Sequence, residues 1–381
     1  TEATAKGGDW DFMGNGWNPI GSNDVYGDEG FTGTFDGDGH AIIGMRIYMD
    51  KNLPAETGET LSFGLFANVK GEIRNLEIKQ GNIQIPSLTI SWKENLNLYI
   101  GAIAGKLSVG QLVNCLTTIS ISFGPNGCGG GNIDNPMFHI GGIVGFSDTG
   151  SSIKHCGNMG DVTAYEERDY CHFDLFTAGI AGKNFGTIEQ CWNSGDIDSI
   201  SRSSGDYYYS GMSKAYYTGT IWIGGITGGG LNSSDNQNES MIKNCYNIGT
   251  VSASSYNSNP QDGKGAVKAG GIIGDLSNWN HTSVYNCYNC GNVTTFEKEE
   301  QGFGIYSGWG IAENNYYLTG TGKNSVGSTS LTEALLMWAL ISTQSGRFIP
   351  MVNTRILNYR PCRRIPWRPF KSFAFCFRPT G

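Results

Sequence analysis

The chain has 381 residues, 57 of them glycine, and only 16% of its residues are charged. Glycine at this density breaks helices and so argues against a helix-rich enzyme, and the lack of a strict glycine triplet excludes collagen. No run of about 18 apolar residues occurs, so we expect no transmembrane segment. Thr1 is not a methionine and no apolar signal core follows it, which indicates a processed, trimmed or incomplete start.

The formal net charge of −8 is unevenly divided along the chain. Residues 1–330 carry 18 basic and 33 acidic residues, a balance of −15, whereas residues 331–381 carry eight basic residues and one acid, a balance of +7. We therefore predict a boundary near Ser330. The segment Leu331–Ile341 (LTEALLMWALI) predicts one short helix, and the residues after it show no period of 2 or 3.6.

Three interpretations stay open for this basic tail. It is a poorly ordered segment, a contact for nucleic acid or membrane through interleaved arginines and aromatic residues, or an out-of-frame read that is not the native ending. Because the body of the chain carries −15, it opposes binding to a polyanion, and we expect no nucleic-acid partner.

A glycine-rich unit recurs along the body. Copies of Gly-Gly-Ile-x-Gly, or close variants of it, end at Gly105, Gly145, Gly182, Gly228 and Gly274, so the periods are 40, 37, 46 and 46 residues. A cysteine follows each copy, namely Cys115, Cys156, Cys191, Cys245 and Cys287. From the second copy on, this cysteine opens the pattern Cys-x-Asn-x-Gly-x-(Val or Ile), with Asn158, Asn193, Asn247 and Asn289.

This repeat predicts an all-β fold. β-branched residues that alternate with small ones indicate short strands around a narrow interior, and one such unit cannot bury its apolar face alone. We therefore predict a parallel β-helix, or β-solenoid, of about 40-residue repeats with loop insertions. A β-propeller is the alternative, although it needs four strands per repeat and only two or three are evident. The asparagines are expected either to adopt the left-handed conformation or to bind turn backbone.

The predicted organisation has three parts. Residues 1–98 form an N-terminal capping region with the first rungs, residues 99–320 form the repeat solenoid, and residues 321–381 form the short helix and the basic irregular tail.

The segments Gly224–Gly228 and Ile242–Val251 resemble the GLUG-motif repeats of bacterial surface and secreted proteins. Upstream, Trp17–Gly21 and Phe31–His40 are similar to the segment that precedes such repeats. Near the end, Asn314–Leu318 is similar to the last rung, with Asn315 in place of a cysteine. The resemblance covers roughly residues 10–320 and implies a β-solenoid, an extracellular or cell-surface location, and membership of a larger surface protein as one alternative.

The resemblance does not imply any particular chemistry, because GLUG-motif repeats accompany adhesins and IgA-type metallopeptidases alike. No His-Glu-x-x-His motif occurs, so we do not expect that metallopeptidase chemistry here.

The cysteines and the acids have structural interpretations. Equivalent cysteines in stacked coils point the same way, so we expect the five repeat cysteines to be buried free thiols. Cys287 and Cys290 form a Cys-x-x-Cys without a second pair, which does not predict zinc. His155 takes a position where other copies have asparagine or glutamine, so we interpret it as a turn residue. Asp36 and Asp38 predict a tight turn, with calcium as the alternative, and we expect no metal or cofactor.

The candidate ligand site is the largest insertion, Ser199–Trp222. Its aromatic residues suit carbohydrate rings or protein partners, and the alternative is that they simply cover the solenoid flank. These residues are Tyr207, Tyr208, Tyr209, Tyr216, Tyr217 and Trp222. A second insertion, Ser252–Lys268, is predicted to be a flexible loop.

We therefore expect a non-enzymatic, adhesin-like protein of the bacterial surface or secreted fraction, which binds host or environmental glycans or proteins through its loops. The alternative is a β-helix polysaccharide lyase or hydrolase, which needs a cluster of acids from adjacent coils. Asp161 and Asp196 occupy one repeat position, but Thr250 and Asn292 occupy it in later copies, so the enzyme is the less favoured hypothesis.

Overall fold

The computed structural model describes residues 16–21, 30–53, 60–90, 97–124, 137–168, 173–203, 220–230, 240–257, 266–276, 282–295, 300–308, 310–325 and 327–332. The chain divides into two units, Thr1–Thr332 and Glu333–Gly381, and all of these residues belong to the first. The basic tail lies outside the described residues, so its three interpretations stay predictions.

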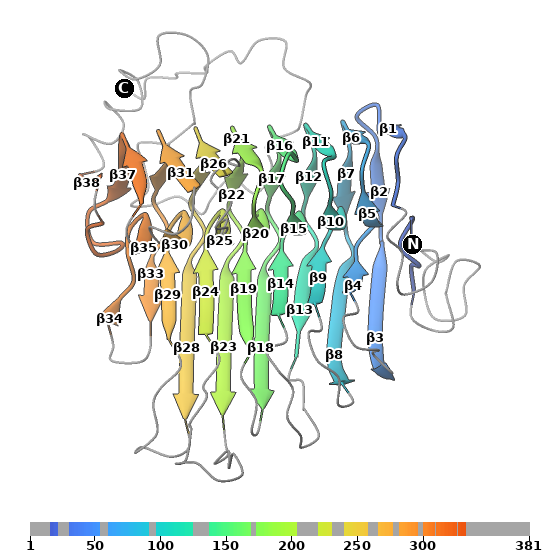
Figure 1. The fold of residues 1–381 in the computed structure, drawn as a ribbon, viewed down its shortest axis with the longest axis horizontal. Helices are drawn as coiled ribbons and strands as arrows, with labels where there is room; N and C mark the ends of the chain where they lie inside the picture. Colours follow the sequence, from blue (N-terminus) through green and yellow to red (C-terminus); the bar gives the residue numbers. More distant parts are fainter. Residues whose placement is uncertain are drawn as a thin grey trace, which may run out of the picture. The chain divides into compact units, whose positions relative to one another are not determined.

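The strands form five sheets, which we number in the order in which a coil visits them (Figure 1). Sheet I contains β4 (Thr60–Phe63), β9 (Asn97–Gly101), β14 (Met137–Gly141), β19 (Asp174–Ala178), β24 (Thr220–Gly224) and β29 (Val267–Gly270). Sheet II contains β5 (Phe66–Val69), β10 (Ala104–Leu107), β15 (Val144–Ser147), β20 (Ala181–Asn184), β25 (Thr227–Gly229), β30 (Ile273–Leu276) and β35 (Tyr306–Gly308).

Sheets III and IV follow. Sheet III contains β1 (Thr34–Asp36), β6 (Glu72–Arg74), β11 (Gln111–Val113), β16 (Ser152–Lys154), β21 (Thr187–Glu189), β26 (Ser240–Lys243), β31 (Thr282–Tyr285) and β36 (Ile311–Glu313). Sheet IV contains β2 (Ala41–Ile43), β7 (Glu77–Lys79), β12 (Leu116–Thr117), β17 (Gly157–Asn158), β22 (Trp192–Asn193), β27 (Tyr246–Asn247), β32 (Tyr288–Asn289), β37 (Asn315–Leu318) and β38 (Ser328–Leu331).

Sheet V completes each coil. It contains β3 (Arg46–Leu53), β8 (Asn82–Ile90), β13 (Ser120–Phe123), β18 (Val162–Arg168), β23 (Ile197–Ser203), β28 (Val251–Asn257), β33 (Val293–Thr295) and β34 (Glu300–Gln301).

The predicted parallel β-helix is confirmed. Each strand pairs in parallel with the equivalent strand of the next coil, and the one exception among the named strands is the antiparallel pair β33–β34. The propeller alternative is wrong, because partners come from successive repeats rather than from within one blade. A complete coil has five strands rather than two or three. Strands as short as β17 and β22 contain two residues, too few to show any periodicity in the sequence.

The predicted start of the C-terminal helix is wrong. Leu331 was expected to begin a helix, but it ends β38 and pairs in parallel with Leu318 of β37. The rest of the predicted helix lies outside the described residues. No helix among the described residues is long and apolar enough to cross a bilayer.

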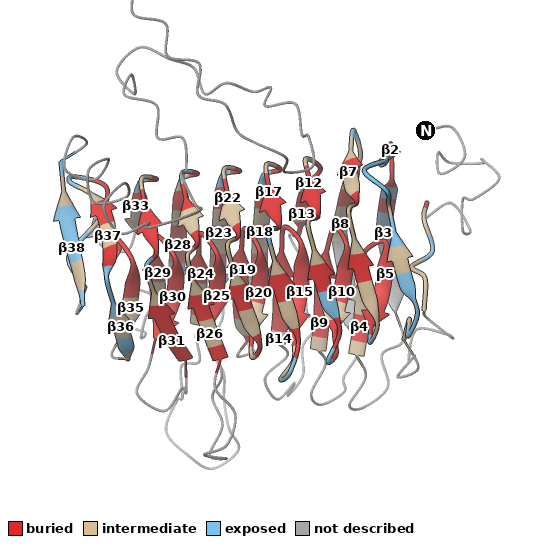
Figure 2. Cartoon of the chain, turned by 90° about the horizontal axis from the view of Figure 1, so that it is seen from above, coloured by how far each residue is buried: buried red, intermediate tan, exposed pale blue. Residues whose placement is uncertain are grey.

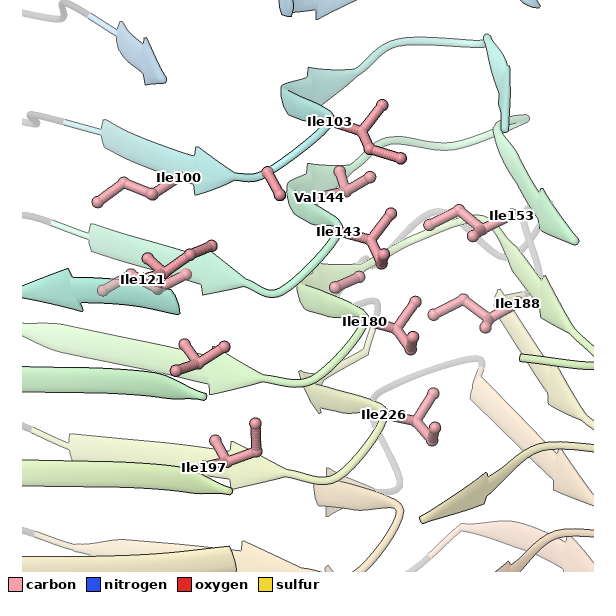
Figure 3. Close-up of a cluster of buried hydrophobic side chains, with 14 of the residues drawn as sticks. Ile100, Ile103, Ile121, Ile143, Val144, Ile153, Ile180, Ile188, Ile197 and Ile226 are labelled. Carbon is pink, nitrogen blue, oxygen red and sulfur yellow. The ribbon is translucent and has the colours of Figure 1, made fainter. Parts of the chain in front are cut away.

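The core is a set of columns of branched aliphatic side chains that run along the stack of coils (Figure 3). Ile103, Ile143, Ile180 and Ile226 form one such column at the corner between sheets I and II. All four are fully buried, so each coil covers the apolar face of its neighbour. Burial is lower at the last rung, where β36 and β38 contain exposed residues (Figure 2).

The Gly-Gly-Ile-x-Gly unit is the corner between sheets I and II. Gly141 ends β14, Gly142 and Ile143 turn the chain, and β15 begins at the next residue. A Cβ atom on Gly142 would clash with the backbone of the next coil and lie 2.5 Å from Cγ of Asn158 in its own coil. The second glycine therefore makes room for the asparagine. One coil has Ala102 at this corner, and the same coil has Thr117 in the asparagine position.

The asparagines form a continuous buried ladder. Nδ2 of Asn158 donates to the carbonyl of Gly160 at 2.7 Å and to Oδ1 of Asn193 in the next coil at 2.8 Å. The same bond between coils recurs from Asn193 to Asn247 and from Asn247 to Asn289, at 2.8 Å each. These buried amides are therefore satisfied by one another and by turn backbone, which is the second of the two roles expected for them.

The left-handed conformation instead belongs to the residue before each cysteine or its equivalent. Its φ lies between 52° and 61° at Asn75, Asn114, His155, Gln190, Asn244, Asn286 and Asn314. His155 is thus a turn residue, as expected.

The five repeat cysteines are buried free thiols, as predicted. Sγ of Cys191 donates to the carbonyl of Ile153 in the previous coil at 3.5 Å and accepts the backbone N–H of Cys156 at 3.4 Å. At the last rung Asn315 replaces the cysteine in both roles. Its Oδ1 accepts the N–H of Cys287 and its Nδ2 donates to the carbonyl of Val284, both at 2.9 Å. Burial raises the pKa of the Cys191 and Cys287 thiols well above the usual value.

These thiols are expected to resist alkylation. A protonated, buried sulfur is a poor nucleophile, so iodoacetamide at pH 8 should leave Cys191 and Cys287 unmodified until denaturant unfolds the chain. Cys290, which is half-buried, should be modified earlier and serves as the control. Peptide mass spectrometry resolves each site. Alkylation of Cys191 in the folded chain as fast as Cys290 would contradict the stacked interior.

The corner glycine and the ladder asparagine are expected to be coupled. Gly142→Ala should lower the free energy of unfolding by about 1–3 kcal/mol, because the added methyl overpacks against Asn158. Combined with Asn158→Thr, it should cost less than the two single changes together, since the pair Ala102 and Thr117 already coexists in one coil. Urea denaturation of the four proteins measures the coupling, and strict additivity would refute it.

Candidate functional site

The strands of sheet V end at one edge of the solenoid (Figure 1), and the longest insertions of the sequence follow them, in the connections from sheet V to sheet I. We call this the loop edge. The chain passes from sheet V to sheet I through residues 54–59, 91–96, 125–136, 169–172, 204–219 and 258–265. By contrast, two residues join sheet I to sheet II at the Gly142 corner. The variable lengths of the repeats therefore arise mainly at one edge, and the core columns stay aligned.

The two insertions singled out from the sequence both fall on the loop edge, but their bounds were too wide. Ser199–Ser203 belongs to β23 and Thr220–Trp222 to β24. Likewise, Ser252–Asn257 belongs to β28, so this part of the predicted flexible loop is a strand. Serine- and asparagine-rich residues give no strand signal, yet β28 pairs with β23 along seven residues.

Trp222 is the member of the candidate ligand site that the structure describes. Its side chain is half-buried on β24 and stacks on Phe176 of β19, with ring centroids 4.4 Å apart and planes 6° apart. Nζ of Lys268 lies 6.0 Å from the Trp222 ring. The other members, Tyr207, Tyr208, Tyr209, Tyr216 and Tyr217, lie outside the described residues.

Trp222 is one of four rings that occupy the same strand position in successive coils of sheet I. We call Tyr99, His139, Phe176 and Trp222 the aromatic ladder. Neighbouring centroids are 5.0 Å apart from Tyr99 to His139 and again from His139 to Phe176. This ladder is not recognisable in the sequence, because the four residue types differ and only the strand register reveals their equivalence.

Side chains of sheet II pack against the rings of the aromatic ladder. Phe146 on β15 stacks on Tyr99 at 5.1 Å. Nζ of Lys183 on β20 lies 4.4 Å from the Phe176 ring and 5.3 Å from that of Phe185. Tyr99, His139 and Phe176 are only 7%, 2% and 5% exposed, so these three rings serve packing. Trp222 is the ladder member with substantial surface left for a ligand.

Burial also shifts the titration of two ladder groups. It lowers the pKa of His139 well below its usual value, and the nearby Lys183 ammonium lowers it further. Burial lowers the pKa of Lys183 to about 8, opposed in part by Asp174. Nδ1 of His139 finds no hydrogen-bond partner within the described part of the chain. A neutral imidazole among rings is therefore the stable state of His139 in the folded chain.

His139 is expected to make the fold acid-labile. Unfolding restores its ordinary pKa of 6.5, so below that pH the unfolded chain binds the additional proton and stability falls as pH falls. His139→Phe, which keeps an aromatic ring in the ladder, should remove up to about 2 kcal/mol of the stability lost between pH 7.5 and 5.0. Urea denaturation at both pH values tests this. Equal losses in the variant and the unmodified chain would exclude His139 as the cause.

The carboxylates weighed for catalysis or metal binding have structural partners. Oδ1 of Asp161 accepts the backbone N–H of Asp196 at 2.9 Å, and Oδ1 of Asp196 accepts that of Thr250 at 2.8 Å. Each therefore ties its coil to the next.

Asp36 also has structural partners, two side chains of the next coil and one N–H of its own turn. Asn75, the N–H of Asp38 and Arg74 donate to its carboxylate, in that order of effect, and hold its pKa at about 2. Over the described residues, no group of three or more histidine, cysteine or acidic side chains lies close enough together to hold a metal ion.

No protein-family model and no curated protein matches the chain. Among solved structures, it is similar to a Bacteroides ovatus protein described as a "putative immunoglobulin A1 protease", with 19% sequence identity and a TM-score of 0.47. The match covers 86% of this chain and 76% of that one. The strand order establishes the parallel β-helix, and the resemblance to GLUG-motif repeats stays a prediction.

Proposed function

We propose that this chain is a non-enzymatic, adhesin-like protein that binds glycan or protein ligands through the loop edge of its solenoid. An extracellular or bacterial cell-surface location is part of the proposal, as is a place within a larger surface protein. The observation that carries it is Trp222, a half-buried indole in the strand that follows the 204–219 connection.

Within a coil, the residues that hold the stack together are distinct from the variable loops, and this separation supports the proposal. Its glycines, cysteines and asparagines bind neighbouring coils and have no capacity left for a ligand, as the Asn193 and Cys191 bonds illustrate. The loop edge is where the repeats differ, and a rigid scaffold that carries variable loops is a common arrangement for recognition. A half-buried indole at the base of such a loop keeps part of its apolar surface for a sugar ring or for a partner's side chain.

The alternative, a β-helix lyase or hydrolase, requires carboxylates from adjacent coils that are free to reach a substrate. Asp161 and Asp196 come from adjacent coils, but each uses an oxygen to accept a backbone N–H of the next coil. The described contacts of these two carboxylates serve the stacking of the coils, so we do not favour the hypothesis of an enzyme.

The loop-edge proposal predicts which connection matters. Replacing residues 204–219 by a short Gly-Ser linker should abolish binding to a glycan and mucin array, because it removes the aromatic segment. The replacement leaves β23 and β24 intact, so the fold should be retained. The matched control replaces residues 258–265, the next connection on the same edge, and should retain binding. Equal loss in both variants, or full binding without residues 204–219, would contradict this assignment.

A further inference from the structure

A second group of side chains, two exposed and one half-buried, lies on the outer face of sheet V close to the loop edge, and the proposed function leaves it unused. It consists of Tyr165 on β18, Arg202 on β23 and Tyr256 on β28, from three successive coils. Arg202 is directly opposite Tyr256 in the parallel pairing of β23 with β28. Sheet V thus brings together residues that are more than 35 positions apart in sequence.

The guanidinium of Arg202 lies between the two tyrosines. Its Cζ is 5.4 Å from the centroid of the Tyr165 ring and 5.7 Å from that of the Tyr256 ring. A cation within about 6 Å of a ring centroid is attracted by the ring electrons, so both tyrosines hold the guanidinium in place. Holding the side chain in this way reduces the entropy that it would lose when a ligand binds.

Arg202 presents its guanidinium to solvent. Its side chain is exposed, and no ion pair to it is found among the side chains that the structure describes; the side chain of Glu167, opposite Arg202 in the pairing of β18 with β23, lies outside them. A guanidinium presents five N–H donors in a planar fork that matches a carboxylate with two parallel bonds. An exposed, prepositioned arginine is therefore chemically suited to a carboxylate.

The neighbouring side chains suit a sugar. Tyr256 is 49% exposed, so its ring has apolar surface for the C–H face of a pyranose. On the same outer face, four residues before Arg202 and Tyr256 on their strands, Thr163, Asp198 and Ser252 lie in register across the same three coils. Their hydroxyl and carboxylate oxygens are the groups that bind sugar hydroxyls.

The net negative charge of residues 1–330 limits which acidic ligands can bind. Residues 1–330 carry 18 basic and 33 acidic residues, so the field around the solenoid repels a polyanion. A single carboxylate at the end of an otherwise neutral oligosaccharide avoids most of this repulsion, because only the local pairing with Arg202 acts on it.

We propose that Arg202, held between Tyr165 and Tyr256, binds the carboxylate of one terminal acidic sugar, with the exposed ring of Tyr256 against the pyranose. The inference rests on the proposed glycan-binding function and deepens it, since it names an acidic terminal sugar as the ligand class. It also places the site on the β23 side of the 204–219 connection, one residue before β23 ends.

Calorimetric titration of the full chain with paired oligosaccharides tests the inference. The probes are sialyllactose, a glucuronate-terminated trisaccharide, and lactose as the neutral partner. Both acidic probes, or one of them, should bind at least about tenfold more tightly than lactose. Arg202→Gln should remove that preference, so that the acidic probes bind no more tightly than lactose. Arg202→Lys, which keeps the charge without the planar fork, should recover only part of it.

The matched control is Lys154→Gln, which removes one positive charge from a half-exposed side chain on sheet III. It should leave the acidic preference intact. Equal binding of acidic and neutral probes, or equal effects of Arg202→Gln and Lys154→Gln, would overturn the inference. Unchanged resistance of Cys191 to alkylation in the folded variants shows that a loss of binding is not a loss of fold.

The same titrations separate the two proposals. If replacing residues 204–219 leaves an acidic preference that depends on Arg202, the loop-edge function fails and the arginine site stands. If binding requires residues 204–219 but is indifferent to Arg202, the acidic-sugar inference fails and the loop-edge function stands.

Discussion

The close stacking of parallel coils is the constraint on which the rest of the structure depends. Strands of adjacent coils lie about 4.8 Å apart, so any backbone that turns a corner must pass directly over the equivalent corner below it. A Cβ atom on Gly195 would meet the carbonyl of Gly160, and one on Gly249 would meet that of Gly195. Glycine recurs at this position in these coils because a Cβ atom would clash with the carbonyl of the coil below, and the adjacent buried asparagines bridge the coils where the backbone turns.

The strict repeats were predictable from sequence because stacking demands identity. The corner glycines, the cysteines and the asparagines must match from coil to coil, and their spacing alone indicated a solenoid with buried thiols. Features that tolerate variation were not predictable. Tyr99, His139, Phe176 and Trp222 share one strand position but no residue type, and two-residue strands such as β17 leave no pattern. Asn315 shows that even a ladder cysteine is replaceable by a group with the same donor and acceptor.

The two functional proposals meet at one place in the chain. Arg202 lies near the end of β23 and Trp222 near the start of β24, so they flank the same 204–219 connection from sheets V and I. Both side chains are fixed by aromatic contacts with the preceding coil, Arg202 by Tyr165 and Trp222 by Phe176. The rigid stack thereby supplies prepositioned groups on either side of its longest variable segment, and recognition needs no change in the repeats themselves.

The central claim is that equivalent positions of successive coils form straight rows, and pulsed electron spin resonance between two spin labels tests it most directly. Gln84, Ser122, Thr163, Asp198, Ser252 and Thr294 form one row on the outer face of sheet V. With one label at Gln84, moving the second from Thr163 to Ser252 to Thr294 should give backbone separations of about 10, 19 and 24 Å. Distances that fail to grow with the number of coils between the labels would contradict the solenoid.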